Sequence, residues 1–134
     1  MAREYLTIGE LAARSGVPIS TVRYYERRGL VAPLGRSSGD YRLYGQQAIS
    51  DMDFIATAKA SGFTLRDIAL LMGMRSTGLC ADVEPVFRTR SEAIMQSIRA
   101  LEDRKASLIS LAKTCLAESQ TCKALEELSR PAAE

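Results

Sequence analysis

Apolar residues at the start of the chain recur at helical intervals. Thr7 followed by Glu10 has the pattern of a capping box. In this motif the threonine hydroxyl accepts from the amide of the residue three positions later, and the glutamate side chain accepts from the amide of the threonine. Behind this cap the apolar positions follow three- and four-residue spacing, at Ile8, Leu11 and Ala12. The pattern predicts a first helix that stops at Ser15-Gly16.

A second short helix is predicted from about residue 19 to residue 28, after a turn at Val17-Pro18. Ile19 and Val22 are expected to face inward, together with Glu26 or Tyr25. The outward positions are polar, basic or aromatic: Ser20, Thr21, Arg23, Tyr24 and Arg27. Two short helices joined by a tight turn are typical of a helix-turn-helix, and such side chains can bond base edges and phosphates. An ordinary amphipathic helix with a solvated basic face would show the same pattern.

The helical period breaks over residues 33–44. Turn-forming glycine, serine and aspartate lead into an alternating segment, Tyr41-Arg42-Leu43-Tyr44. We predict a β-hairpin with Arg36 at its tip and Tyr41, Arg42 and Tyr44 on its return strand. Beside a helix-turn-helix, such a hairpin forms a wing that can lie along the DNA backbone or in the minor groove. Two further helices, at roughly 45–61 and 64–72, complete the head.

The second half of the chain is dominated by one long heptad pattern. From residue 82 to about residue 115 there is no glycine, and the single proline, Pro85, is expected in the first turn, where it is tolerated. Apolar side chains recur every seven residues, at Phe87, Ile94, Leu101 and Leu108, and Cys115 continues the series. This stripe is typical of a coiled coil. Because one charged helix cannot bury its apolar face alone, dimerisation is expected, with packing onto the head as the alternative.

Composition adds little until its distribution is considered. The net charge of the 134 residues is only +2, but six arginines stand against Glu26 and Asp40 between residues 14 and 42. This local excess fits a phosphate-facing segment, and it equally fits a solvated charged surface. No apolar run is long enough to cross a bilayer and the N-terminus lacks a signal-peptide core, so we expect a cytoplasmic protein without a membrane partner. With no histidine, nucleophile elbow or phosphate loop, an enzyme is not expected.

The chain contains three cysteines, an odd number in a protein expected to be cytoplasmic, where disulfides rarely persist. They stand at Cys80, Cys115 and Cys122. Their number and spacing alone leave three interpretations open: buried structural thiols, a reactive thiol, or metal ligands.

Taken together, the motifs of the first half resemble the MerR family of transcriptional activators. The matching stretches are Thr7-Ile-Gly-Glu-Leu-Ala, Gly16-Val, Val22-Arg-Tyr-Tyr-Glu-Arg-Arg-Gly-Leu30, Gly39-Asp-Tyr-Arg-Leu-Tyr44 and Ser61-Gly-Phe-Thr-Leu-Arg-Asp-Ile68. The resemblance implies a homodimer that binds a palindromic, double-stranded promoter with an unusually long spacer. It also implies that the bound effector makes the dimer bend and untwist the spacer, so that RNA polymerase can engage both promoter elements.

The resemblance also implies which residues contact DNA. Carried over by position, these are Arg23 and Tyr24 of the recognition helix, Tyr41 and Arg42 of the wing, and Lys59 on the following helix pair, as a phosphate contact. Ser20 and Thr21 stand at positions that vary within the family. With Arg36 of the hairpin, they complete the expected DNA-binding set.

Mercury-, cadmium- and lead-responsive members of the family have cysteine at the positions of Cys80, Cys115 and Cys122, so the resemblance implies a metal sensor. About 35 residues of helix at 1.5 Å per residue separate Cys80 from Cys115 by roughly 50 Å, too far to share an ion within one chain. If the long helices pair antiparallel, Cys80 of the partner subunit comes close to Cys115 and Cys122. The expected site therefore lies between subunits, and a dimer has two.

Thiolates favour soft or borderline ions, and the chain has no histidine for a mixed zinc site. The family's zinc sensors add a second cysteine and a histidine, and its copper(I) sensors have serine in place of Cys80. The expected effector is therefore Cd²⁺, Pb²⁺ or Hg²⁺, with Zn²⁺ less favoured. Glu118, Ser119 or water could supply a fourth ligand. The alternative is a thiol-based redox or electrophile sensor of the same fold.

The expected fold is mostly α. A winged helix-turn-helix DNA-binding domain is predicted for residues 1–75, followed by a linker over 76–82 that carries Cys80. A long dimerisation helix forming an antiparallel coiled coil is predicted for 83–116. A short metal-binding loop and a C-terminal helix or tail are predicted for 117–134.

Overall fold

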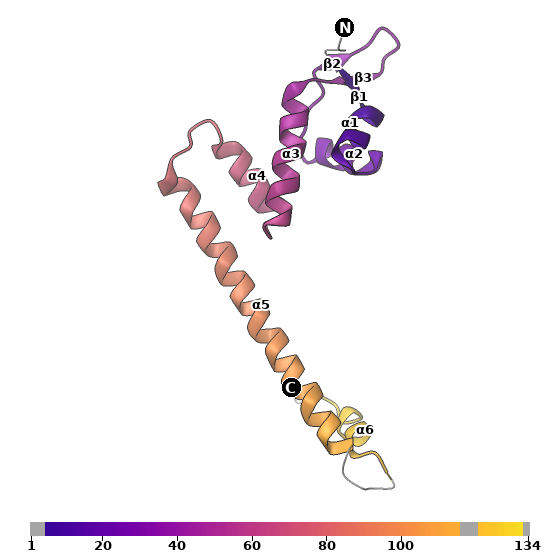
Figure 1. Cartoon of the computed structure of the whole chain (residues 1–134), viewed down its shortest axis with the longest axis vertical. Helices are drawn as coiled ribbons and strands as arrows, with labels where there is room; N and C mark the ends of the chain where they lie inside the picture. Colours follow the sequence, from indigo (N-terminus) through magenta and orange to yellow (C-terminus); the bar gives the residue numbers. More distant parts are fainter. Residues whose placement is uncertain (1–4, 116–120, 133–134) are drawn as a thin grey trace. The chain divides into compact units, whose positions relative to one another are not determined.

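The computed structural model describes residues 5–115 and 121–132 (Figure 1). The chain divides into two units between residues 87 and 88. The elements of the first unit are β1 (Leu6–Thr7), α1 (Ile8–Ser15), α2 (Ile19–Arg27), β2 (Gly35–Arg36), β3 (Arg42–Tyr44), α3 (Gln46–Ala60) and α4 (Leu65–Met74). Helix α5 (Cys80–Cys115) begins in the first unit and ends in the second, which also holds α6 (Lys123–Leu128).

Side-chain caps set the beginning of α1 as the sequence predicts. The Thr7 hydroxyl accepts from the amide of Glu10 at 3.2 Å, and the Glu10 carboxylate accepts from the amide of Thr7 at 2.8 Å. Thr64 and Asp67 form the same reciprocal pair at the start of α4. Each box satisfies amides that have no partner within their own helix. Helix α1 ends at Gly16, whose φ of 68° favours glycine.

The wing is part of a three-stranded antiparallel sheet with strand order β1-β3-β2. The sequence predicted only the hairpin, because the two residues of β1 are too few to show alternation. Arg36 pairs with Arg42 within the strands, so its predicted place at the hairpin tip is wrong. The tip is the turn over residues 37–40, closed by a 3.0 Å bond from the Asp40 amide to the Ser37 carbonyl.

One hydrophobic core holds the helices and the sheet of the first unit together. Its fully buried side chains come from α1, α2, β3, α3 and α4, namely Leu11, Val22, Tyr44, Ile55 and Ile68. Ile19, predicted to face inward, is instead 41% exposed, and Tyr25 takes the buried position on α2. The core therefore presents the arginine-bearing face of α2 outward.

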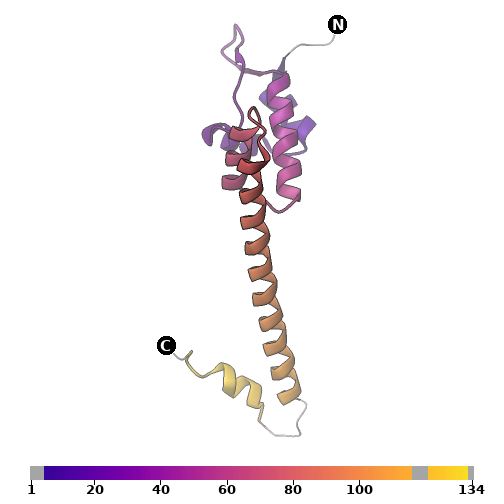
Figure 2. The same ribbon diagram turned by 90° about the vertical axis from the view of Figure 1, so that its left-hand side faces the viewer.

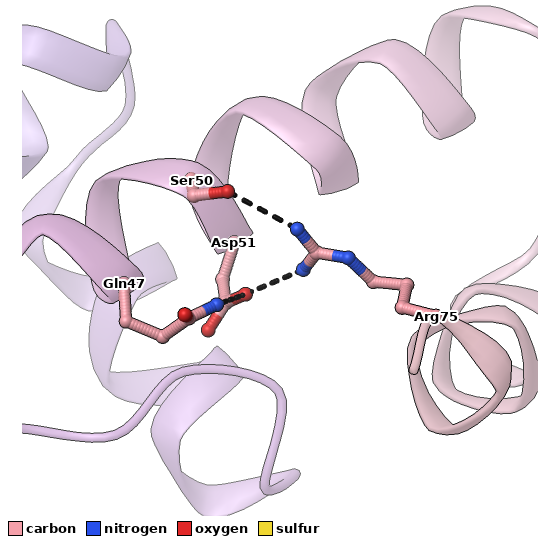
Figure 3. Close-up of polar contacts among 4 residues, drawn as sticks. All are labelled: Gln47, Ser50, Asp51 and Arg75. Carbon is pink, nitrogen blue, oxygen red and sulfur yellow. Dashed lines mark hydrogen bonds and ion pairs between the residues drawn. The ribbon is translucent and has the colours of Figure 1, made fainter. Parts of the chain in front are cut away.

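Arg75, at the C-terminal end of α4, is bound to α3 by polar contacts (Figure 3). Its guanidinium donates to the Asp51 carboxylate at 2.6 Å and to the Ser50 hydroxyl at 3.1 Å, and it lies over the Phe54 ring at 4.8 Å. Gln47 donates to the same Asp51 oxygen at 2.9 Å. These contacts fix the end of α4 on α3, where the chain leaves the head toward α5.

Helix α5 is continuous from Cys80 to Cys115 and can be followed without a break in Figure 2. It begins earlier than the sequence predicted, because the Leu79 carbonyl already accepts from the amides of Asp82 and Val83. Cys80 is therefore the first residue of the helix and does not lie in a linker before it. The position predicted for Pro85 is also wrong: it lies inside the helix, beyond the first turn. Among residues 5–115 and 121–132, no helix is both long and apolar enough to cross a membrane.

Arg75→Ala is expected to lower the free energy of unfolding by about 1 kcal/mol, because the pair is only partly shielded from water. Urea denaturation followed by circular dichroism measures this. Arg66→Ala, at an exposed position of the same helix, is the matched control and should change stability little. Equal effects of the two substitutions would contradict the assigned role of Arg75.

Candidate nucleic-acid interface and thiol pair

The exposed face of α2 and the wing share one surface of the head. Ser20, Arg23 and Tyr24 are exposed on α2, and Thr21 is half-buried. Two depressions overlap here. The first is lined by Arg23, Glu26, Arg27, Pro33 and Arg42, and the second by Ile8, Arg23, Arg36, Asp40, Tyr41 and Arg42. Since Arg23 and Arg42 belong to both, the cations of helix and wing surround a single concave, basic surface.

Glu26 joins the recognition helix to the wing. Its carboxylate accepts from the Tyr44 hydroxyl at 2.5 Å and from the Arg42 guanidinium at 3.1 Å. The Glu26 side chain is only 11% exposed and Tyr44 is fully buried. Burial, followed by the hydrogen bond to Glu26, raises the pKa of Tyr44 well above its ordinary value, so the hydroxyl remains a neutral donor. No pattern in the sequence predicts this contact between Glu26 and Tyr44; the available signal is a carboxylate within an otherwise basic helix.

Three of the other predicted DNA-binding side chains, Tyr24, Arg36 and Lys59, have polar partners within the head. Arg36 pairs with Asp40 at 3.0 Å, and the Lys59 ammonium donates to the Tyr25 hydroxyl at 3.4 Å. Arg28 donates to the Tyr24 hydroxyl at 3.1 Å and lies over its ring. Tyr41 is 72% exposed on the wing. These contacts hold the side chains in place, and their role toward DNA remains a prediction.

Two of the three cysteines lie side by side. Cys115 is the last residue of α5 and Cys122 directly precedes α6, and their sulfur atoms are 3.4 Å apart. Both are exposed, as is Cys80 at the other end of α5. No three His, Cys, Asp or Glu side chains come together in the part of the chain that the structure describes. Glu118 and Ser119, predicted as further ligands, lie outside the described residues.

The environment of the two sulfurs differs. The backbone amide of Leu125, the Cys115 thiol and the amide of Ala124 lower the pKa of Cys122, in that order. The hydrogen bond with Cys122 raises the pKa of Cys115, with smaller contributions from desolvation and the charge of Cys122. For comparison, two thiolates on one tetrahedral zinc ion, with Zn–S bonds of about 2.3 Å, have sulfur atoms about 3.8 Å apart. The separation of 3.4 Å lies close to this span, so a small side-chain rotation fits the pair to one ion.

Apolar side chains along α5 remain exposed. No residue of this helix is buried. Among the predicted dimerisation residues Ile94 is 40%, Leu101 60% and Leu108 67% exposed. The Phe87 ring packs near the Phe63 ring of the head, with 5.4 Å between centroids, yet Phe87 is still 49% exposed. Large apolar side chains left in water along one helix are suited to a partner surface.

A helix-turn-helix with a basic wing defines a nucleic-acid-binding regulator, and comparison with known proteins specifies its family. Residues 6–74 match the model of the MerR helix-turn-helix family of regulatory proteins, and residues 49–111 match the MerR DNA-binding model. The chain belongs to the MerR family. It is therefore a DNA-binding transcriptional regulator and not an enzyme, as the sequence predicted.

Known proteins also match most of the length of this chain. A mercuric resistance operon regulatory protein of Bacillus cereus is 36% identical over 110 residues, 81% of this chain and 83% of the relative. The helix-turn-helix regulator HmrR of Sinorhizobium medicae strain WSM419 is 31% identical over 129 residues, which cover 93% of this chain and 87% of the relative. The structure of the regulator PbrR691 of Ralstonia metallidurans CH34 in complex with lead(II) superposes with a TM-score of 0.80 at 29% identity, covering 96% of this chain and all of that one.

Tyr44→Phe is expected to lower the free energy of unfolding by about 1–2 kcal/mol, because a shielded carboxylate loses a charged hydrogen bond. Denaturant titration provides the measurement. Tyr41→Phe removes the same atom from a side chain that is 72% exposed and should be nearly neutral. A neutral Tyr44→Phe would show that the bond to Glu26 does not stabilise the head.

Arg23→Ala is expected to weaken promoter binding by about 1–3 kcal/mol if Arg23 contacts a base, and to reduce the salt slope by about one if it contacts phosphate. Binding isotherms at several salt concentrations separate these cases. Arg99→Ala, at an exposed position of α5, loses the same charge and serves as the control. Unchanged affinity at matched salt would remove Arg23 from the interface.

Proposed function

We propose that this chain is a homodimeric, metal-responsive transcriptional regulator whose effector is a soft divalent ion held by Cys80, Cys115 and Cys122. The observation that carries the proposal is the 3.4 Å separation of the Cys115 and Cys122 sulfurs, both exposed and close to the span of two thiolates on one ion. Two relatives support it by their own functions, one a mercuric resistance regulator and the other solved with lead(II).

The third ligand comes from the second protomer. Because α5 is a continuous helix of 36 residues, its rise of about 1.5 Å per residue separates Cys80 from Cys115 by roughly 50 Å. In an antiparallel pair of α5 helices, Cys80 of the partner subunit lies at the end that carries Cys115 and Cys122. The exposed apolar side chains of Ile94, Leu101 and Leu108 supply the surface for this pairing, together with Phe87. A dimer then has two sites, each between subunits.

The ion is expected to be Cd²⁺, Pb²⁺ or Hg²⁺, with Zn²⁺ less favoured. Thiolates prefer soft ions, and three thiolate charges balance a divalent cation better than a monovalent one. The chain has no histidine with which to build a mixed zinc site. When bound, the ion joins the end of α5 in one protomer to its beginning in the other.

The two heads of the dimer transmit the effect of metal binding to the promoter DNA. Ser20, Thr21, Arg23 and Tyr24 of α2 contact the double-stranded promoter from the major groove. The wing residues Arg36, Tyr41 and Arg42 and the helix residue Lys59 contact its backbone. Metal binding changes how the two heads are held, so that the dimer bends and untwists the DNA between them and RNA polymerase can engage the promoter. The contacts of Arg75 with Ser50 and Asp51 provide a rigid connection between the head and the segment before α5.

Metal binding is tested by titrating the thiols of the reduced protein with and without Cd²⁺, Pb²⁺, Hg²⁺ and Zn²⁺. We expect three protected thiols per chain and a thiolate-to-metal absorbance band, with the strongest response for one of the first three ions. In a reporter assay, Cys80→Ser should abolish metal-dependent activation while promoter binding is unchanged. Absence of protection by every ion would refute metal sensing.

The position of the site between subunits is tested with a mixed dimer. One protomer carries Cys80→Ser and the other carries both Cys115→Ser and Cys122→Ser. Neither homodimer can assemble three thiolates around one ion, but the mixed dimer retains all three at one of its two ends. Recovery of one three-thiolate site per mixed dimer is the expected outcome, and its failure would mean that the ligands do not combine across the interface.

A further inference from the structure

The Cys115–Cys122 pair has a chemical property that metal binding does not use. The two sulfurs are in hydrogen-bond contact at 3.4 Å, both side chains are exposed, and both belong to the second unit of the chain. Redox-active cysteines are typically accessible to solvent and lie next to a second thiol that can resolve the first oxidation product. These features fit an oxidisable dithiol as well as two of the three ligands of the proposed metal site.

We propose that Cys115 and Cys122 form a reversible intramolecular disulfide when the metal-free protein meets a hydroperoxide, and that this disulfide blocks the metal response. The oxidation step stands on the geometry of the pair alone. Its consequence for metal sensing rests on the function proposed above.

Little movement is needed for the bond to form. The sulfurs must approach from 3.4 Å to the bond length of about 2.05 Å, a change within reach of side-chain rotation at two exposed positions. Only six residues separate the two cysteines in the sequence, so the second thiol can reach an oxidised first one within the same chain. Cys80 has no such neighbour within its own chain, because α5 places it at the opposite end of the helix.

The chemistry balances with the hydroperoxide as the only oxidant. The thiolate of one cysteine attacks the outer peroxide oxygen, the O–O bond breaks, and the products are a sulfenic acid and an alcohol, or water if the oxidant is hydrogen peroxide. The second thiolate then attacks the sulfenic sulfur, forming the S–S bond and releasing water. In total, two thiols lose two protons and two electrons and the peroxide is reduced. An excess of a dithiol reductant reverses the change by thiol–disulfide exchange.

The consequence for metal binding follows from charge. Thiolates are the ligands of soft metal ions, and a disulfide sulfur carries no negative charge. Oxidation therefore leaves only Cys80 of the partner subunit at each proposed site. A bound ion has the opposite effect, since it occupies both thiolates and protects them from the peroxide. The metal ion and the peroxide therefore compete for the same two sulfur atoms.

The test uses the full chain, reduced and metal-free, titrated with hydrogen peroxide. We expect titratable thiols to fall from three to one per chain, the mass to decrease by two hydrogen atoms, and a peptide linked between Cys115 and Cys122 to appear. The chain should keep its monomer mobility on a non-reducing gel. Cys80→Ser is the matched control: it should form the same disulfide at the same rate, with thiols falling from two to none.

Two further measurements complete the test. The double variant Cys80→Ser/Cys115→Ser keeps Cys122 as its single thiol, so it should form no intrachain disulfide and should accumulate sulfenic acid that a diketone probe can trap. Preloading the wild-type protein with Cd²⁺ should slow disulfide formation at least tenfold. A disulfide that joins two chains through Cys80, or direct overoxidation without a disulfide, would overturn the proposal.

Failure of this inference is distinguishable from failure of the proposed function. Disulfide formation is measured without metal, so it succeeds or fails independently of metal sensing. If the reduced protein binds Cd²⁺ with three thiolates but no Cys115–Cys122 disulfide forms, only the oxidation proposal is wrong. If the disulfide forms but the oxidised protein still binds Cd²⁺ as tightly as the reduced protein, the proposed block on metal sensing is wrong.

Discussion

The carboxylate of Glu26 holds together the basic surface formed by α2 and the wing. It stands near the C-terminal end of α2 and accepts from Tyr44 and Arg42, both on β3. Because Tyr44 is completely buried, the bond anchors the wing in the core. The same carboxylate offsets part of the charge of an arginine-rich surface, which would otherwise repel itself. The basic surface of α2 and the wing is thus held in shape in part by a carboxylate of its own, Glu26.

A second constraint is the continuity of α5. A helix of 36 residues without an interruption cannot bring its two ends together, and it leaves its apolar side chains in water. In the proposed dimer, a second copy of the chain meets both consequences, because it covers the apolar side chains and supplies the third thiol. The helix therefore makes the proposed sensor dependent on the dimer, whereas the dithiol at its end is complete within one chain.

Much of the architecture could be predicted because its signals are local. The capping boxes at Thr7 and Thr64 depend on residues three positions apart, and the heptad pattern of α5 repeats over a long segment. The short strand β1 and the position of Arg36 could not be predicted in this way. A two-residue strand has no periodicity, and the register of a hairpin depends on which residues pair across it. The start of α5 at Cys80 was missed because the residues before it carry no strong cap.

The sequence by itself determined that this is a MerR-type helix-turn-helix with a wing, a long heptad helix and three cysteines, since each of these is recorded in residue order and spacing. Three contacts became visible in the fold: Glu26 and Tyr44 join helix to wing, Arg75 ties α4 to α3, and the sulfurs of Cys115 and Cys122 are 3.4 Å apart. The physical reason is the same in each case. These contacts join residues on different elements, and their distances depend on how the elements pack, which no local pattern in the chain encodes.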